Sequence, residues 1–193
     1  MGIQNEAKEV EFMIAVAFAP CGTDHASQHA AAVALRDRLI AAAGLDPDAY
    51  VHTKTEKGKP YAMGAPFTYS LSHSGRLCCC ALSYAGDAPL LPLPDAIVRL
   101  FPGSGDVGVD IEYIDPEKDL PRLQKIAVRY LPGSPEITNA AAFYAAWTRL
   151  EACGKCTGDG IFAPSRSDDM RFDTFTVEHC GERYAVSIAR KTG

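Results

Sequence analysis

Three short segments of the chain together supply three carboxylates, a lysine and a histidine. Residues 70–75 read Ser-Leu-Ser-His-Ser-Gly, residues 108–112 read Gly-Val-Asp-Ile-Glu, and residues 147–155 read Trp-Thr-Arg-Leu-Glu-Ala-Cys-Gly-Lys. Carboxylates are the hard oxygen ligands that Mg²⁺ takes in proteins, and lysine and histidine donate hydrogen bonds to phosphate oxygens. Each segment alone is a weak signal, but the combination suits a magnesium-bound pyrophosphate.

The middle segment is expected to place two carboxylates on one face of a strand. Because side chains alternate along a strand, Asp110 and Glu112 point to one side while Val109 and Ile111 point to the other. Gly108 lies on the carboxylate side and leaves room beside them. For an isolated Asp-x-Glu, an exposed strand face or a salt-bridged pair is the more common explanation.

The third segment predicts a helix whose candidate functional residues share one face. Trp147, Glu151 and Lys155 are spaced i, i+4 and i+8, so they share one side of the helix. Trp147 is expected to pack in the core. A surface ion pair between Glu151 and Lys155 is the simpler interpretation of those two residues alone. However, the glycine turn at 158–160 would let the end of this helix form one wall of a cleft.

A basic loop precedes the histidine segment. Lys54, Lys57 and Lys59 lie in a glycine-broken stretch, and His73 follows among three serines. Such donors on loops suit phosphate oxygens. A solvated lysine loop and a serine-rich turn explain the same residues when each is taken separately.

The seven cysteines do not resemble a disulfide framework, because the count is odd and three of them are consecutive. We therefore expect a reducing, cytoplasmic environment. Cys153 and Cys156 form a C-x-x-C, and His179 adjoins Cys180, so a zinc or redox site is an alternative. No second C-x-x-C exists and this one closes a helix, which favours cysteines that act as small apolar side chains.

Composition excludes several classes of function. The chain has 193 residues, 47% hydrophobic residues and a net charge of −5, which is typical of a globular protein without general affinity for nucleic acid. The apolar run at 12–19 is too short to span a bilayer, so no membrane association is expected.

The order of expected elements predicts an α/β (α+β) fold with two comparable lobes. We expect strands at 12–18, 77–85 and 107–112, helices at 25–43, 116–131 and 134–156, and a closing hairpin at 172–189 around Gly181. Asp115 is the expected N-cap of the second helix. The proline-rich stretch 86–105 is expected to be a loop or linker. We place the lobe boundary between residues 95 and 96.

Taken together, these segments resemble the 4′-phosphopantetheinyl transferases, in particular the pseudo-dimeric type that serves synthases and peptide synthetases. That family shows a Gly-Lys-Pro loop, a Phe-Asn-x-Ser-His-Ser turn, a Gly-(Val/Ile)-Asp-x-Glu strand and a Trp-Thr-x-Lys-Glu-x-x-x-Lys helix. The corresponding segments here lie at 58–60, 69–74, 108–112 and 147–155. The resemblance covers about residues 53–160.

The resemblance implies a fold, a reaction and a set of residue roles. The active site would lie between the two lobes of a pseudo-dimer, and coenzyme A would donate 4′-phosphopantetheine to a serine of an acyl or peptidyl carrier protein, releasing 3′,5′-ADP. Such holo-acyl-carrier-protein synthase activity depends on Mg²⁺, although oxygen ligands accept Mn²⁺ as well. The implied metal ligands are Asp110, Glu112 and Glu151, with Glu151, Lys155 and Asp110 catalytic. The implied coenzyme contacts are Lys59, Ser72, His73 and Lys155.

The chain also departs from that family. Leu150 stands where the family has the lysine before the glutamate, and Tyr69 and Ser70 replace the phenylalanine and asparagine of the turn. The short N-terminal half lacks the basic cluster expected at the 3′-phosphate, for which Arg36 and Arg38 are weak substitutes.

Two other functions use the same residues. The chain could be a non-catalytic member that binds coenzyme A or a carrier protein, or an unrelated metal-dependent phosphohydrolase. A hydrolase would consume pyrophosphate compounds without a carrier, and a binding protein would show affinity without turnover.

The helix expected at 116–131 is a candidate surface for an acidic carrier protein. Arg122, Lys125 and Arg129 share one face of it, and electrostatic attraction would aid encounter. A solvated face over an apolar stripe of Leu123, Ile126 and Tyr130 is an equally good interpretation. Because a cleft between two lobes of one chain needs no second chain, we expect a monomer.

Overall fold

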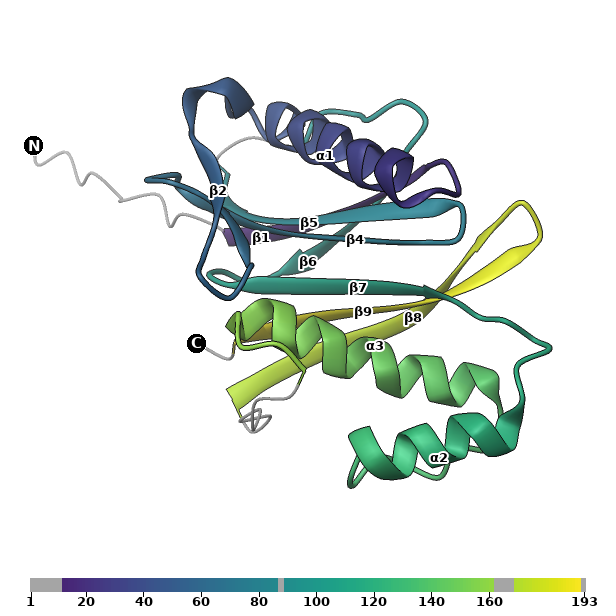
Figure 1. The fold of residues 1–193 in the computed structure, drawn as a ribbon. Coiled ribbons are helices and arrows are strands. Elements are labelled where there is room, and N and C mark those ends of the chain that lie inside the picture. The colour runs from purple at the N-terminus through teal and green to yellow at the C-terminus, as the bar shows by residue number, and fades with distance from the viewer. Residues whose placement is uncertain (1–11, 87–88, 162–168, 192–193) are drawn as a thin grey trace, which may run out of the picture.

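The computed structural model describes residues 12–86, 89–161 and 169–191, and it is a mixed α/β protein built on two main sheets (Figure 1). The first sheet has the order β4-β5-β1-β6, and all of its neighbouring strands are antiparallel. Its strands are β1 (Phe12–Pro20), β4 (Phe67–Ser74), β5 (Leu77–Ala85) and β6 (Ile97–Pro102). Helix α1 (His25–Ala42) covers one face of this sheet.

The second sheet has the order β7-β9-β8 and is also antiparallel. It consists of β7 (Val107–Tyr113), β8 (Met170–His179) and β9 (Glu182–Lys191). Helix α3 (Ala140–Thr157) covers its outer face, and α2 (Leu120–Tyr130) packs on α3. The mixed α/β class expected from the sequence is therefore confirmed.

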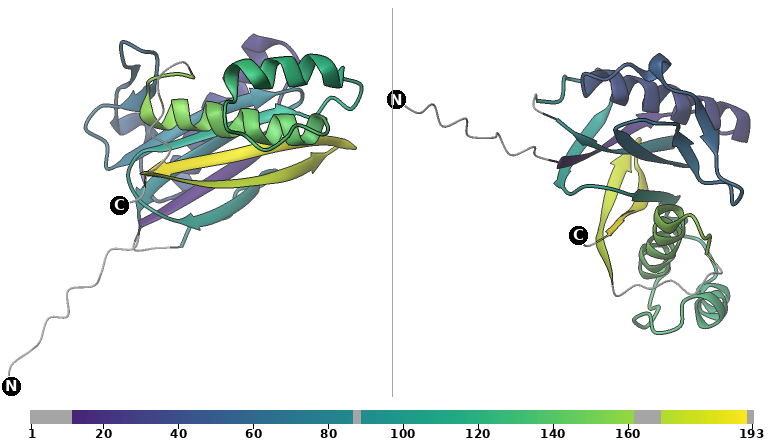
Figure 2. Two further views of the ribbon diagram at one scale, coloured as in Figure 1. Left: turned by 90° about the horizontal axis from the view of Figure 1, so that it is seen from below. Right: turned by 90° about the vertical axis from the view of Figure 1, so that its left-hand side faces the viewer.

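The two sheets pack face to face between the two layers of helices (Figure 2). Side chains from β1 and β5 meet side chains from β7 and β9 in one apolar cluster that includes Val16, Cys79, Val109 and Val186. Strand β5 is buried on both faces, which explains its unbroken apolar run. Cys78 and Cys80 face α1, whereas Cys79 faces the second sheet.

A small two-stranded sheet stands at one end of the first sheet. A short 3₁₀ helix (Pro47–Ala49) precedes β2 (His52–Lys54), which pairs with β3 (Pro60–Ala62). The turn between them, residues 55–59, carries Lys57 and Lys59 of the basic loop, whereas Lys54 is the last residue of β2. Gly58 adopts a positive φ of 86° in this turn.

Several expected elements are confirmed, and three details of the prediction are wrong. Residues 86–105 are not a continuous loop, because β6 forms at Ile97–Pro102 and pairs with β1. A proline is tolerated at the end of an edge strand, where it removes no ladder donor. This strand follows the expected lobe boundary at 95/96 yet belongs to the first sheet, and the two-lobe division itself stays a prediction.

Both C-terminal helices begin later than expected. The N-cap of α2 is Asp119, whose side chain accepts the N–H of Arg122, whereas Asp115 accepts the N–H of Glu117 in a preceding turn. The N-cap of α3 is Asn139, whose side chain accepts from Ala142 at 2.8 Å. Residues 116–119 and 134–139, expected to form the first turns of these helices, lie in the connecting segments instead. In the described ranges no helix is long and apolar enough to cross a membrane.

Candidate active site

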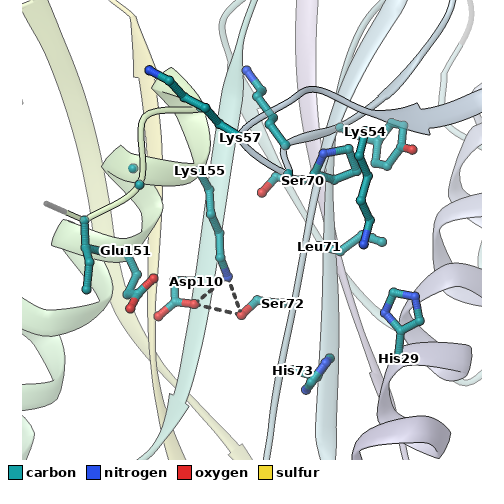
Figure 3. A pocket seen from close by; sticks show the side chains of 18 of the residues that line it. His29, Lys54, Lys57, Ser70, Leu71, Ser72, His73, Asp110, Glu151 and Lys155 are labelled. Carbon is teal, nitrogen blue, oxygen red and sulfur yellow. Dashed lines mark hydrogen bonds and ion pairs between the residues drawn. The ribbon is translucent and has the colours of Figure 1, made fainter. Parts of the chain in front are cut away.

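A cleft of about 690 Å³ lies between the β2–β3 turn, β4, β7 and α3 (Figure 3). It brings together side chains that are far apart in the sequence. Every site residue expected from the sequence lines this cleft: Lys59, Ser72, His73, Asp110, Glu112, Glu151 and Lys155.

Strands β4 and β7 lie side by side and form one wall of the cleft, although they belong to different sheets. Three serines of β4 join them. The hydroxyls of Ser70, Ser72 and Ser74 accept the backbone N–H groups of Val109, Ile111 and Tyr113 at 3.0, 3.4 and 3.0 Å. Because β7 is an edge strand, these contacts satisfy N–H groups that would otherwise lack a partner. We call this arrangement the serine ladder.

Asp110 is the most buried carboxylate of the cleft, with 4% of its surface exposed. Its Oδ1 accepts hydrogen bonds from Ser72 Oγ at 2.8 Å and from Lys155 Nζ at 2.7 Å, as the dashed lines in Figure 3 show. Among the residues that the structure describes, its Oδ2 has no hydrogen-bond partner although it is buried. A buried carboxylate oxygen without a donor is costly, so this atom calls for a positive ligand.

Glu112 and Glu151 experience the charge of Asp110. Burial, followed by the charge of Asp110, raises the pKa of Glu112 to about 7. The same two causes raise the pKa of Glu151 above its ordinary value. Three carboxylates that repel one another in a cleft form an oxygen donor set that a divalent cation would stabilise.

The donor set and the partnerless Asp110 Oδ2 fit a hard cation such as Mg²⁺. Within the described part of the chain, however, no three His, Cys, Asp or Glu side chains already form a metal-binding cluster. The assignment of Asp110, Glu112 and Glu151 as ligands therefore stays a prediction.

Gly108 controls how closely α3 approaches β7. A Cβ at this position would lie 2.0 Å from the carbonyl oxygen of Ala152 and 2.5 Å from the amide nitrogen of Cys156. The space that we expected beside the carboxylates is thus filled by the backbone of α3. This close approach brings Glu151 and Lys155 over the strand that carries Asp110.

Lys155 extends from α3 to β4 and β7. Its ammonium group donates to Ser72 Oγ at 2.8 Å and to Asp110 Oδ1 at 2.7 Å. Lys155 thus directs its charge at Asp110 rather than forming a surface pair with Glu151. The third residue of that stripe, Trp147, packs against Phe143 and Tyr130 as expected.

The lysines of the β2–β3 turn contact the second half of the chain. Lys59 Nζ donates to Asp106 Oδ1 and to the carbonyl of Cys156, both at 2.7 Å, and Lys57 pairs with Asp159 at 2.6 Å. Lys59 therefore connects the β2–β3 turn to the start of β7 and the end of α3. Its expected contact with a coenzyme phosphate stays a prediction.

More histidines gather beside the cleft than the sequence indicated. His73 lies on β4, and its ring meets the ring of His25 at 5.3 Å, while His25 stacks on His29 at 6.4 Å. Burial, followed by the neighbouring His25, Lys155 and His29, lowers the pKa of His73. His29 also lines the cleft and was missed. Its i, i+4 spacing from His25 at the start of α1 was the signal available in the sequence.

Arg36 and Arg38 each have partners in the structure. Arg36 pairs with Asp37 and lies over the ring of Tyr69, while Arg38 hydrogen-bonds the carbonyl of Pro94. Neither lines the cleft, so their suggested role as substitute phosphate ligands gains no support here and stays a prediction. Tyr69 instead hydrogen-bonds His52 at 3.1 Å, which ties β2 to β4.

Five of the seven cysteines are buried and pack in the interior, whereas Cys21 is half-buried and Cys180 is exposed. All seven lie in the described part of the chain, and no disulfide joins them. Cys156 is buried in α3, where burial raises the pKa of its thiol to about 11, and Cys180 lies in the distant β8–β9 turn. A zinc site that combines Cys153, Cys156, His179 and Cys180 has no support in this geometry.

Leu150, which departs from the family pattern, does not line the cleft. It packs with the apolar cluster between α2 and α3, together with Trp147 and Leu123. A lysine at this position would place a charge in that cluster, so the substitution suits this helix pair.

Comparisons with known proteins show which family this chain resembles. Residues 106–191 match the family model of the 4′-phosphopantetheinyl transferase superfamily. The chain is 30% identical over 137 residues to the 4′-phosphopantetheinyl transferase HetI of a Nostoc species, covering 66% of this chain and 49% of HetI. It is 31% identical over 132 residues to the 4′-phosphopantetheinyl transferase AcpT of Salmonella typhimurium, covering 65% of this chain and 58% of AcpT. The matches thus span about half the length of these curated relatives.

Proposed function

We propose that this chain, whose residues 106–191 belong to the 4′-phosphopantetheinyl transferase superfamily, transfers 4′-phosphopantetheine from coenzyme A to a serine of an acyl or peptidyl carrier protein. The second product is 3′,5′-ADP. The observation that carries the proposal is the convergence of Asp110, Glu112, Glu151, Lys155 and His73 on one cleft. These groups come from β4, β7 and α3, and they supply the charges that a bound pyrophosphate requires.

Asp110, Glu112 and Glu151 are the proposed ligands of a divalent cation, Mg²⁺ or Mn²⁺. When bound there, the cation would offset the negative charge of the pyrophosphate. The buried Asp110 Oδ2 and the raised pKa values of Glu112 and Glu151 support this assignment.

Glu151 is the proposed general base for the attacking serine. Burial and the charge of Asp110 raise the pKa of its carboxyl, which makes it a better proton acceptor than an ordinary glutamate. Its place on α3, half-buried at the cleft wall, lets it accept the proton directly or through a water molecule.

Lys155 is the proposed donor to the phosphate that departs with ADP. Ser72 and Asp110 use two of its three N–H donors, so the third can reach a phosphate oxygen. His73 and Lys59 are the proposed contacts for the remaining phosphates, with Ser72 beside them.

The carrier protein is proposed to dock on α2. Arg122, Lys125 and Arg129 are exposed on this helix, while Leu123 and Ile126 pack towards α3. A basic face suits an acidic partner and would speed encounter. Since one chain lines the whole cleft, we propose a monomer. The seven cysteines without a disulfide favour the reducing cytoplasm.

The test is a transfer assay read by intact-protein mass spectrometry. The purified protein is incubated with an apo carrier protein, coenzyme A and Mg²⁺, with and without a chelator. Asp110→Ala and Glu151→Ala are compared with Glu178→Gln, which changes an exposed carboxylate on β8 away from the cleft. We expect the carrier to gain one phosphopantetheine with the wild type and Glu178→Gln only, and the chelator to abolish the gain.

The same assay separates the alternative functions. Loss of coenzyme A without any carrier would indicate a phosphohydrolase. Coenzyme A binding without modification of acyl or peptidyl carriers would indicate a binding protein. Either result would refute the proposed transfer.

A further inference from the structure

The serine ladder repeats the same contact three times, but its members differ in one respect. Ser72 and Ser74 each have a carboxylate opposite them, Asp110 and Glu112, and Ser70 has Gly108 in the corresponding place. Ser72 Oγ donates to Asp110 Oδ1 at 2.8 Å, and Ser74 Oγ donates to Glu112 Oε2 at 2.9 Å.

The direction of these hydrogen bonds follows from the chemistry of the hydroxyl group. A serine hydroxyl has one hydrogen and two lone pairs, while an ionised carboxylate is only an acceptor. In Ser74, the backbone N–H of Tyr113 occupies a lone pair at 3.0 Å, so the hydroxyl hydrogen can point at Glu112. In Ser72, the N–H of Ile111 and the ammonium of Lys155 occupy the lone pairs, so its hydrogen is directed at Asp110.

Each carboxylate is therefore held by one oxygen. Asp110 is held at Oδ1 and Glu112 at Oε2, whereas Asp110 Oδ2 is buried and has no partner within the described part of the chain. We propose that Ser74, together with Ser72, is a positioning residue that binds one oxygen of each carboxylate and presents the other oxygen to a divalent cation. This inference rests on the proposed function, because it concerns the cation of the same site.

Ser70 provides the matched comparison within the chain. It accepts the N–H of Val109 at 3.0 Å, the same distance at which Ser74 accepts the N–H of Tyr113. Removing either hydroxyl leaves one N–H of β7 without its serine partner. Only the loss of the Ser74 hydroxyl also releases a carboxylate. A purely structural role would therefore affect both variants alike, whereas a positioning role would separate them.

The experiment measures Mn²⁺ binding to the full chain in the absence of coenzyme A, by titration monitored with electron paramagnetic resonance. The variants are Ser74→Ala, Ser70→Ala and Ser74→Thr, and the last restores a hydroxyl on a side chain suited to a strand. Thermal unfolding of each variant shows how much the ladder itself is weakened. Transfer to an apo carrier protein is assayed with the same preparations.

We expect Ser74→Ala to weaken Mn²⁺ binding by about 10-fold or more, the usual effect of losing an outer-shell partner of a metal ligand. Ser70→Ala should stay within about 2-fold of the wild type, Ser74→Thr should restore binding, and both alanine variants should lose similar thermal stability. Equal Mn²⁺ affinities of the two alanine variants would overturn the inference while leaving the proposed transfer intact. Failure of the wild type to bind Mn²⁺ would overturn the inference as well as the metal site. Mn²⁺ binding without carrier modification would refute only the transferase function.

Discussion

Gly108→Ala tests whether the packing of α3 on β7 sets the geometry of the site. Gly108 has an ordinary backbone conformation, so an alanine there introduces no strain of its own. The added Cβ, however, would lie 2.0 Å from the Ala152 carbonyl oxygen and 2.5 Å from the Cys156 amide nitrogen. Both atoms belong to the α3 backbone, which cannot turn away as a flexible side chain can. The helix itself must move.

The size of that movement follows from the contact distances. Restoring a separation of 3.0–3.4 Å requires Ala152 to retreat by about 1.0–1.4 Å. Overpacking of this kind typically lowers the free energy of unfolding by about 1–3 kcal/mol. Because two backbone contacts are affected, we expect Gly108→Ala to lower it by about 3 kcal/mol. Ala152 follows Glu151 directly, so the glutamate moves with it. Metal ligands tolerate about 0.2 Å, and a misplacement of about 1 Å costs roughly 100-fold in rate.

The assay combines urea unfolding, Mn²⁺ titration and carrier modification. Leu35→Ala is the control, because Leu35 is 1% exposed in the core between α1 and the first sheet, away from the carboxylates. Its cavity should cost about 2–5 kcal/mol, yet Mn²⁺ affinity should persist. The reasoning would be refuted by a Gly108→Ala protein within about 0.5 kcal/mol of the wild type that binds Mn²⁺ normally.

Four further predictions concern the cleft and the proposed docking surface on α2. Because burial and Asp110 raise the pKa of Glu112 to about 7, Mn²⁺ affinity should fall roughly tenfold between about pH 8 and about pH 6 as the carboxyl is protonated; a flat titration profile would contradict this. In the metal-free protein the folded state binds that proton more tightly than the unfolded state, whose pKa is near 4.5, so stability should decrease as the pH rises from about 4.5 to about 7 in urea unfolding experiments. Lys59→Met and Asp106→Asn should each lower the free energy of unfolding by about 1 kcal/mol, and the double variant should lose less than the sum of the two, because part of each loss is the shared ion pair; additive losses would show that the two residues act independently. Arg122→Glu with Lys125→Glu should raise the KM for carrier protein but not for coenzyme A, and an unchanged carrier KM would rule out docking on α2.

Local signals predicted some element boundaries well and others poorly. The strand at Leu77–Ala85 and the hairpin around Gly181 follow from apolar runs and a glycine turn, and both are present. The start of α2 was misplaced because Asp115 and Asp119 are equally good capping residues. Pro121 favours the later start, because it lies in the first turn of α2 but would interrupt a helix that began at residue 116, and Leu123 and Ala127 then pack against α3. Strand β6 was missed because its pairing partner, β1, lies far away in the sequence.

By itself, the sequence determined which side chains share a face. The two-residue period of a strand puts Asp110 and Glu112 together, and the helical period aligns Glu151 with Lys155. These relations are local, because they depend only on the geometry of one element.

Only the tertiary structure decided what each face meets. The serine ladder, the contact of Lys155 with Asp110, and the position of His29 at the cleft all join elements distant in the chain. Their arrangement depends on how the two sheets bury their shared apolar core and on how closely Gly108 lets α3 approach β7. Periodicity specifies the direction of a side chain within its own element, whereas the packing of the whole core specifies its partner.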